Sequence, residues 1–180
     1  MGAFDPKRQR WIAYWLKRVF CWLGKERPRR LLRRGRPIDP GFAPDELLYT
    51  RWRKRNVNHG RLDASLIRFP DQSVNRQKYS KPQDVLLPEA GNEKSKEWIY
   101  WGVFNFPVHT VLPSIEASGE VICTFRVEHD PVEHNYAHSE IRAYRQGQRI
   151  VDKKLISKEH RKQYRLAIMD KVVIVTEPLV

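Results

Sequence analysis

One short segment, residues 128–142, gathers many of the side chains in this chain that could do acid–base chemistry. It reads EHDPVEHNYAHSEIR and contains three of the six histidines, His129, His134 and His138. Histidine suits proton transfer near neutral pH because its ordinary pKa lies close to the working pH. The segment is therefore the first candidate for a catalytic or ligand-binding site.

A strand over residues 138–145 would project His138, Glu140, Arg142 and Tyr144 from one face, because side chains alternate along a strand. A carboxylate base, a histidine acid and an arginine on the phosphate are the groups that metal-independent RNA cleavage needs. The chemistry parallels that of small microbial and toxin ribonucleases. This hypothesis makes His138, Glu140 and Arg142 the candidate catalytic residues, with His129 and His134 as further candidates.

Three other interpretations of the same segment remain. The three histidines plus one carboxylate could hold a metal, but their spacing matches no strong ligand signature, and we expect neither a metal nor another cofactor. His138-Ser139-Glu140 resembles the His-x-Glu motif of zinc deaminases, a family that also needs a downstream Pro-Cys-x-x-Cys pair. No cysteine follows Cys123 in this chain. The segment could also be an ordinary turn followed by a solvated sheet surface.

Charge is concentrated at the N-terminus, where residues 1–36 carry +10 of the formal net charge of +13. Such a block favours binding to phosphate backbones through counterion release, or to an anionic lipid surface. We divide the chain into this basic arm, residues 1–36, and one folded domain, residues 37–180. The Pro- and Gly-rich run at 37–44 marks the boundary between them.

The arm itself has two parts. Residues 7–24 have helical periodicity and place Trp11, Trp15 and Trp22 on one broad apolar face. This amphipathic helix could dock on a protein partner, lie along nucleic acid or lie at a membrane interface, and it is too short and too charged to span a bilayer. Residues 25–36 form an Arg-rich linker that we expect to be unstructured by itself.

Basic residues that could contact nucleic acid occur in three places. In the linker, the candidates are Arg29, Arg30, Arg33 and Arg34. A second cluster places an aromatic ring inside a basic run, so that arginines could meet phosphates while the ring stacks on a base or enters the core. Its members are Arg51, Trp52, Arg53, Lys54 and Arg55. A third cluster contains Arg76 and Lys78, ahead of a predicted helix start at Ser80-Lys81-Pro82.

The rest of the chain reads mostly as β-strand, with predicted strands at 47–52, 62–69, 98–106, 120–127, 138–145, 149–156 and 171–176. Helices are predicted at 82–87 and at 158–169, the latter capped by Ser157. The fold class is therefore α+β. We expect a mixed or mainly antiparallel sheet of about 5–6 strands with two short helices, preceded by the N-terminal amphipathic helical arm.

Taken together, these features favour a basic nucleic-acid-binding protein, with RNA or a single strand preferred to a duplex. We expect it to be a small subunit of a larger nucleoprotein complex, with a protein partner on the Trp11/Trp15/Trp22 helix. The alternatives are a nuclease-like phosphodiesterase or other His/Glu-dependent enzyme using residues 129–142, and a peripheral membrane protein anchored by residues 7–36. The two cysteines, Cys21 and Cys123, suggest free thiols and a cytoplasmic location.

Overall fold

The computed structural model describes residues 28–58, 61–87 and 100–178. Its main feature is an eight-stranded sheet in the order β10-β5-β1-β4-β8-β7-β6, with β9 paired to β8, and every pairing is antiparallel. The strands of this sheet are β1 (Leu47–Arg53), β4 (Asp71–Arg76), β5 (Trp101–Pro107), β6 (Ser114–Ala117), β7 (Glu120–His129), β8 (His138–Arg145), β9 (Gln148–Arg149) and β10 (Val173–Thr176). A separate small hairpin pairs β2 (Val57–Asn58) with β3 (Arg61–Leu62).

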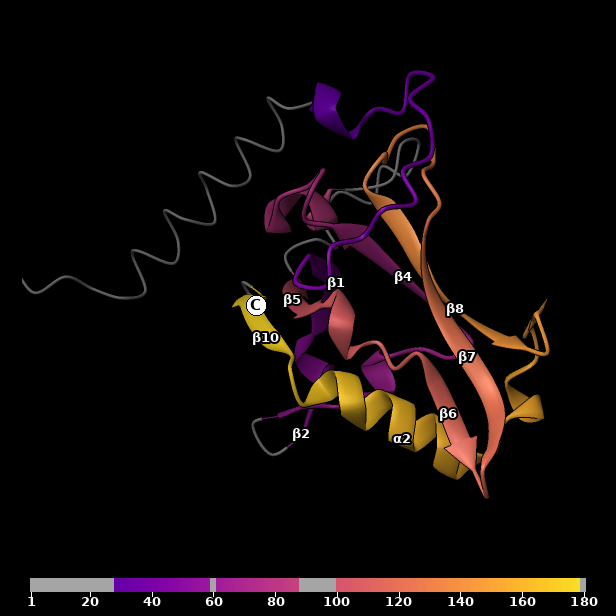
Figure 1. The fold of residues 1–180 in the computed structure, drawn as a ribbon. Helices are drawn as coiled ribbons and strands as arrows, with labels where there is room; N and C mark the ends of the chain where they lie inside the picture. Colours follow the sequence, from indigo (N-terminus) through magenta and orange to yellow (C-terminus); the bar gives the residue numbers. More distant parts are fainter. Residues whose placement is uncertain (1–27, 59–60, 88–99, 179–180) are drawn as a thin grey trace, which may run out of the picture.

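The α-helix of the described chain, α2 (Lys158–Met169), crosses one face of the sheet (Figure 1). Short 3-10 turns make up the other helical elements: η1 (Arg29–Leu31), η2 (Lys54–Asn56), η3 (Ala64–Leu66), η4 (Pro82–Leu86), η6 (Val108–Thr110) and η7 (Lys153–Leu155). The architecture is therefore α+β with one antiparallel sheet and one helix. It has more strands than predicted and one α-helix instead of two.

The core lies between α2 and the sheet, and strands β7 and β8 alternate buried and more exposed side chains along their length. On β8, for example, Ser139, Ile141 and Ala143 are buried, whereas Glu140 and Arg142 are only half-buried. The ring of Tyr164 on α2 stacks on Phe125 of β7, with ring centroids 4.1 Å apart. Burial of aromatic rings contributes strongly to stability, so this contact fixes α2 on the sheet.

Several predicted elements are confirmed at nearly the expected residues. These are the strands at 47–52, 120–127, 138–145 and 171–176, the turn between β8 and β9, and the helix at 158–169. Ser157 caps α2 by accepting the backbone N–H of His160, as its hydroxyl was predicted to do. The strand predicted at 98–106 begins at Trp101 within the described residues. The strand predicted at 149–156 is wrong, because β9 ends at Arg149 and the 3-10 turn η7 follows at Lys153–Leu155.

Two predictions between residues 62 and 87 differ from the structure. Residues 62–69, predicted as a strand, contain the turn η3, and the strand β4 follows Pro70 instead. The short helix predicted after Ser80 is present as the 3-10 turn η4, with Pro82 in its first turn as predicted, but Ser80 donates to the carbonyl of Arg76 and does not cap it. At the start of η4, the side chain of Asp84 accepts the backbone N–H of Lys81.

The second half of the basic arm packs on the folded domain. Leu31 is fully buried, and its carbonyl accepts the backbone N–H of Tyr136 at 2.7 Å. The backbone N–H of Arg33 donates to the carbonyl of Glu133 at 3.0 Å. Residues 28–36 are thus held on the domain by these contacts, with Leu31 as their apolar anchor. The predicted helix at 7–24 lies outside the described residues.

Candidate functional site

The face of the sheet turned away from α2 is polar, and it carries the predicted catalytic strand. The register of β4 and β8 pairs Asn75 with His138, Ser73 with Glu140 and Asp71 with Arg142, so the side chains of these residues share one face. The prediction that His138, Glu140 and Arg142 project from the same side of a strand is confirmed. Their neighbours across the sheet on β1 are Tyr49, Arg51 and Arg53.

The sheet opens in its middle, between β1 and β4. These two strands pair only at Leu48–Arg76 and Tyr49–Asn75. Beyond that point β1 continues along β5 as far as Arg53, while β4 continues along β8 as far as Asp71. The two facing strand edges therefore diverge, and the backbone groups along them need other partners.

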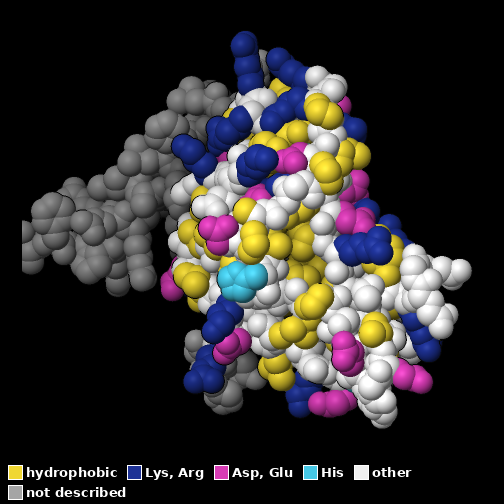
Figure 2. Space-filling model, viewed as in Figure 1, with side chains coloured by type: hydrophobic (Ala, Val, Ile, Leu, Met, Phe, Trp, Pro, Cys, Tyr) yellow, Lys and Arg dark blue, Asp and Glu magenta, His cyan; other side chains and the backbone are white. Residues whose placement is uncertain are grey.

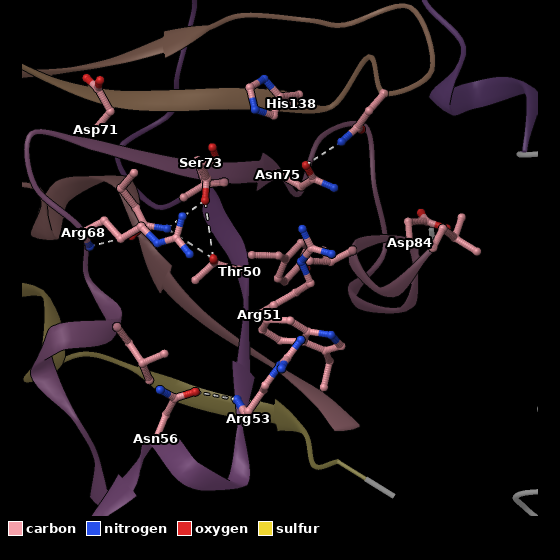
Figure 3. A pocket seen from close by; sticks show the side chains of 18 of the residues that line it. Thr50, Arg51, Arg53, Asn56, Arg68, Asp71, Ser73, Asn75, Asp84 and His138 are labelled. Carbon is pink, nitrogen blue, oxygen red and sulfur yellow. Dashed lines mark hydrogen bonds between the residues drawn. The ribbon is translucent and has the colours of Figure 1, made fainter. Parts of the chain in front are cut away.

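Side chains close the floor of this opening. The amide nitrogen of Gln72 donates to the carbonyl of Ser73 at 2.9 Å and to the hydroxyl of Thr50 at 3.3 Å. The Gln72 amide oxygen accepts the backbone N–H of Arg68 at 2.7 Å. Thr50 in turn donates to the Ser73 carbonyl at 3.4 Å. A buried glutamine and a threonine thus replace part of the missing ladder (Figure 3).

Above this floor lies a groove of about 730 Å³. In Figure 3, Arg51 and Arg53 extend from β1 along one wall, and Ser73, Asn75 and His138 form the opposite wall. At one end the lining continues through Arg55, Asn56, Ser65 and Arg68. At the other end it continues through Asp84, Val85, Leu87, Val132, His134 and Asn135. We call this the β1–β4 groove.

The first wall combines arginine with an aromatic ring. Trp101 of β5 lies directly opposite Arg53 in the sheet register. The guanidinium carbon of Arg53 is 3.9 Å from the centroid of the indole ring, and that of Arg51 is 5.3 Å from it. Such cation–π contacts hold guanidinium groups over a ring. Asn56 fixes the end of β1 by accepting the backbone N–H of Arg53 at 2.9 Å.

The lining of the groove is net positive. It includes four arginines, Arg51, Arg53, Arg55 and Arg68, and two aspartates, Asp71 and Asp84. Both aspartates pair with arginines from outside the lining: Asp71 with Arg149 at 2.9 Å, and Asp84 with Arg30 at 2.6 Å. The two carboxylates of the lining are therefore paired with arginines that lie outside it.

The second wall carries a histidine in a defined orientation. The Nδ1 of His138 lies 2.7 Å from the carbonyl oxygen of Asp130. A carbonyl oxygen can only accept, so Nδ1 carries the proton and the Nε2 of a neutral ring is an acceptor. Beside it, the side-chain amide of Asn135 donates to the Oδ1 of Asn75 at 2.9 Å. The side chains of Ser73, Asn75, Asn135 and His138 make this wall polar.

Glu140 and Arg142, which were predicted to be catalytic together with His138, do not line the groove. Arg142 bonds to Glu128 at 2.8 Å, to Glu140 at 2.8 Å and to Asp130. Tyr144 also donates to Glu128. Burial would lower the pKa of Arg142, yet the bonds to Glu128 and Glu140 hold it above its ordinary value. Arg142 is thus engaged by three carboxylates.

The three histidines do not converge. His134 and His138 line the groove, whereas His129 pairs with Ser139 in the register and so points to the opposite face of the sheet. The Nδ1 of His129 accepts the backbone N–H of Asp39 at 2.9 Å, and its Nε2 donates to the carbonyl of Tyr136 at 2.6 Å. Burial lowers the pKa of His129. These contacts give His129 a structural role.

No group of three His, Cys, Asp or Glu side chains in residues 28–58, 61–87 and 100–178 is arranged to hold a metal ion. Across the same ranges, we find no helix with the length and apolar character needed to cross a membrane.

Two of the predicted nucleic-acid contacts are buried. Trp52 is 4% exposed and donates its indole N–H to the carbonyl of Thr176 at 3.2 Å, so its ring belongs to the core. Arg76 is fully buried and pairs with Glu46 at 2.8 Å and with Asp39 at 3.2 Å. Lys78 is exposed and pairs with Asp39 at 2.8 Å.

The other predicted basic residues remain at the surface or in the groove. Lys54 and Arg55 are exposed, as are Arg29 and Arg34 in the arm. Arg33 is half-buried and donates to the carbonyl of Pro131 at 3.1 Å. In the view of Figure 2, Lys and Arg side chains gather at the end of the molecule where Figure 1 draws η1.

Sequence reasoning missed Trp101 and Arg68 as lining residues of the groove. Trp101 lies in the run WIYWGVFNF, which reads as uniformly apolar and therefore as a core strand. Asn105 could have indicated a polar face here, because it interrupts the apolar run and lies on the same face of β5 as Trp101.

Comparison of the chain with protein-family models, curated proteins and solved structures gives no match.

Proposed function

We propose that this protein binds single-stranded nucleic acid, preferentially RNA, in the β1–β4 groove. The observation that carries the proposal is the wall formed by Trp101 with Arg51 and Arg53, set in a break of the sheet. An aromatic ring flanked by guanidinium groups can stack an unpaired base while the charges meet its phosphates. The basic arm supplies additional, sequence-independent attraction.

Electrostatics supports the groove as the binding surface. Its four arginines come from three separate elements: Arg51 and Arg53 from β1, Arg55 from η2, and Arg68 from the segment before β4. A polyanion with regularly spaced charges can meet several of them at once. Each phosphate neutralised on a single strand adds about 0.7 to the slope of log affinity against log salt.

The shape of the groove favours a single strand over a duplex. Its floor is closed by Gln72 and Thr50, so a ligand lies on the sheet and between the two walls. Bases in a duplex are stacked on one another and cannot reach Trp101 at the wall. The opposite wall offers hydroxyl, amide and imidazole groups at Ser73, Asn75 and His138. These groups can accept or donate to base edges or to a ribose 2′-hydroxyl.

The arm lies close to one end of the groove, because Arg30 pairs with Asp84, a lining residue. The loop that ends the groove at Val132 and His134 also bonds to the arm, through the backbone of Arg33 to Glu133. A nucleic-acid strand that leaves the groove at this end would meet the exposed Arg29 and Arg34. The arm and the groove can therefore serve one ligand.

The test is a fluorescence-anisotropy titration of a labelled single-stranded RNA with the full chain, freed of co-purified nucleic acid. Trp101→Ala should weaken binding roughly tenfold or more, since loss of one base–aromatic stack costs about 1–3 kcal/mol. Arg53→Gln should weaken it and reduce the salt slope by about 0.7. A duplex of the same sequence should bind more weakly than the single strand.

Lys162→Gln on α2 provides the charge-matched control, because it removes one positive charge from an exposed position outside the groove. Its affinity and salt slope should stay close to those of the wild-type chain. Equal losses for Arg53→Gln and Lys162→Gln would mean that binding follows net charge alone. That result would remove the groove from the account.

A second candidate function, phosphodiester cleavage, is favoured by the orientation of His138. Its Nδ1 is held by the Asp130 carbonyl and the ring lines the groove, an arrangement typical of a general base. The groove arginines, such as Arg51, would then stabilise the phosphate in place of Arg142. Glu140 would have no direct part, because it pairs with Arg142 and Arg149.

Cleavage is tested by incubating a labelled RNA with the purified, metal-depleted chain. His138→Ala should abolish product formation while leaving RNA affinity largely intact, and Glu140→Gln should have a smaller effect. Product that persists undiminished in His138→Ala would assign the activity to another residue or to a contaminant. No turnover by the wild-type chain would leave binding as the function.

A further inference from the structure

The strand β10 ends the sheet with an apolar edge. Among the strands that the structure describes, β10 pairs with β5 on one side and is the last in the sheet order. Val173, Ile174 and Val175 are 59%, 43% and 37% exposed. Val173 lies beside Asn105 on the polar face, whereas Ile174 lies beside Phe104 on the core face. Apolar surface is therefore exposed on both faces of the same edge.

Native proteins protect edge strands with charged residues, proline, bulges or short length, because an open, apolar edge can pair with another strand. The centre of β10 carries Val173, Ile174 and Val175 instead. A shift of register between Ile174 and Thr176 gives the edge a local irregularity. The strand is nevertheless held firmly, since the Thr176 hydroxyl accepts the backbone N–H of Val103 at 3.0 Å and the Thr176 carbonyl accepts the indole N–H of Trp52.

The sequence around β10 is complementary to itself in the antiparallel direction. It reads Lys171-Val-Val-Ile174-Val-Thr-Glu177. In an antiparallel pair of two such strands centred on Ile174, each Lys171 faces the Glu177 of the other copy and each Val173 faces a Val175. Lys171 and Glu177 are both exposed. The charges at the two ends thus match in this register, with four apolar residues, 172–175, and Thr176 between them.

We propose that β10 is a dimerisation edge, at which a second copy of this chain pairs its own β10 antiparallel about a twofold axis through Ile174. Such an isologous contact closes at two copies and joins the two sheets into one. Pairing of β10 with β6, the opposite end of the sheet, would instead add copies without limit. The charge pattern of residues 171–177 favours the closed pair.

A contact confined to one strand edge is small, so we expect a dissociation constant on the order of micromolar. Lys171 already pairs with Asp170 of its own chain at 2.9 Å. Both groups are largely exposed, and an exposed pair of this kind contributes little. It therefore competes only weakly with a Glu177 from the second copy.

The test is sedimentation velocity of the full chain, freed of nucleic acid, over a series of concentrations. The wild type should shift from monomer to dimer and no further. Ile174→Lys should stay monomeric, because two lysines would then meet at the axis. Val151→Lys is the matched control, since Val151 is also exposed and apolar but lies outside β10. Its dimerisation should equal that of the wild type.

A charge exchange then tests the register. Lys171→Glu places like charges at both ends of the pair and should weaken the dimer roughly tenfold. Adding Glu177→Lys restores opposite charges and should restore the wild-type dissociation constant. A wild type that remains monomeric at every concentration would overturn the proposal. So would open-ended assembly, a dimer insensitive to Ile174→Lys, or a double exchange that fails to restore affinity.

Discussion

The buried guanidinium of Arg76 provides the sharpest test of how this fold is held together. The side chain is fully buried, and it bonds to both carboxylate oxygens of Glu46, at 2.9 and 2.8 Å. It also bonds to the Asp39 carbonyl at 2.8 Å and to the Gly41 carbonyl. Replacing it with methionine keeps much of its length and removes all of these bonds.

Arg76→Met would leave Glu46, itself only 9% exposed, as a buried carboxylate without its cation. Breaking a buried pair from one side costs about 3–5 kcal/mol. For a chain of 180 residues this corresponds to a fall in Tm of roughly 10 °C. Urea unfolding followed by tryptophan fluorescence measures the loss of free energy directly.

Two controls distinguish a lost ion pair from a general effect of substitution. Arg145→Met, at an exposed position, should change the free energy of unfolding by no more than about 0.5 kcal/mol. Glu46→Gln added to Arg76→Met should recover part of the loss, because no unpaired charge remains. If Arg76→Met lost less than about 1 kcal/mol while nucleic-acid binding fell, Arg76 would be a phosphate contact and the structural reasoning would be refuted.

Two further predictions concern stability. Burial lowers the pKa of His129, so the folded state favours its neutral form. The resulting contribution to the free energy of unfolding is fully present above pH 6.5 and falls as pH drops below that value, by up to about 1.4 kcal/mol per unit. Urea unfolding between pH 7 and about pH 5 should show this slope, and His129→Gln should flatten it. Gly102→Ala should cost about 1–3 kcal/mol, because its Cβ would lie 2.5 Å from the Thr176 carbonyl. Gly41→Ala, whose Cβ has room, should be close to neutral.

Local patterns in the sequence predicted much of the sheet. On β7 and β8 apolar and polar residues alternate, so the strand bounds and the exposed side of His138 and Glu140 followed from period alone. The cap at Ser157 defined the start of α2. Each of these signals lies within one element, which is why it could be found without knowledge of the partners.

The groove could not be predicted in this way, because it depends on where a ladder between distant segments stops. Nothing near Tyr49 or Asn75 in the sequence indicates that β1 and β4 separate there. The burial of Arg76 depends equally on Glu46 and Asp39, which are far from it in the sequence. A basic residue in a polar run reads as solvated until its carboxylate partners are placed.

The histidine segment shows the same limit. His129 and His138 are close in sequence and were grouped as one candidate site. The register of β7 against β8 pairs His129 with Ser139, so the two rings lie on opposite faces of the sheet. A shift of register by one residue would have exchanged these faces. Tertiary register therefore decides which of the titratable groups can act together.

The central claim is that nucleic acid lies on the wall formed by Trp101, Arg51 and Arg53. Ultraviolet crosslinking of the full chain to a single-stranded RNA, followed by mass spectrometry of the crosslinked peptides, tests this location most directly. We predict crosslinks in the peptides that contain Trp101 and residues 51–56, together with some in the arm. Crosslinks confined to residues 1–36 and α2, with none from β1 or β5, would contradict the account.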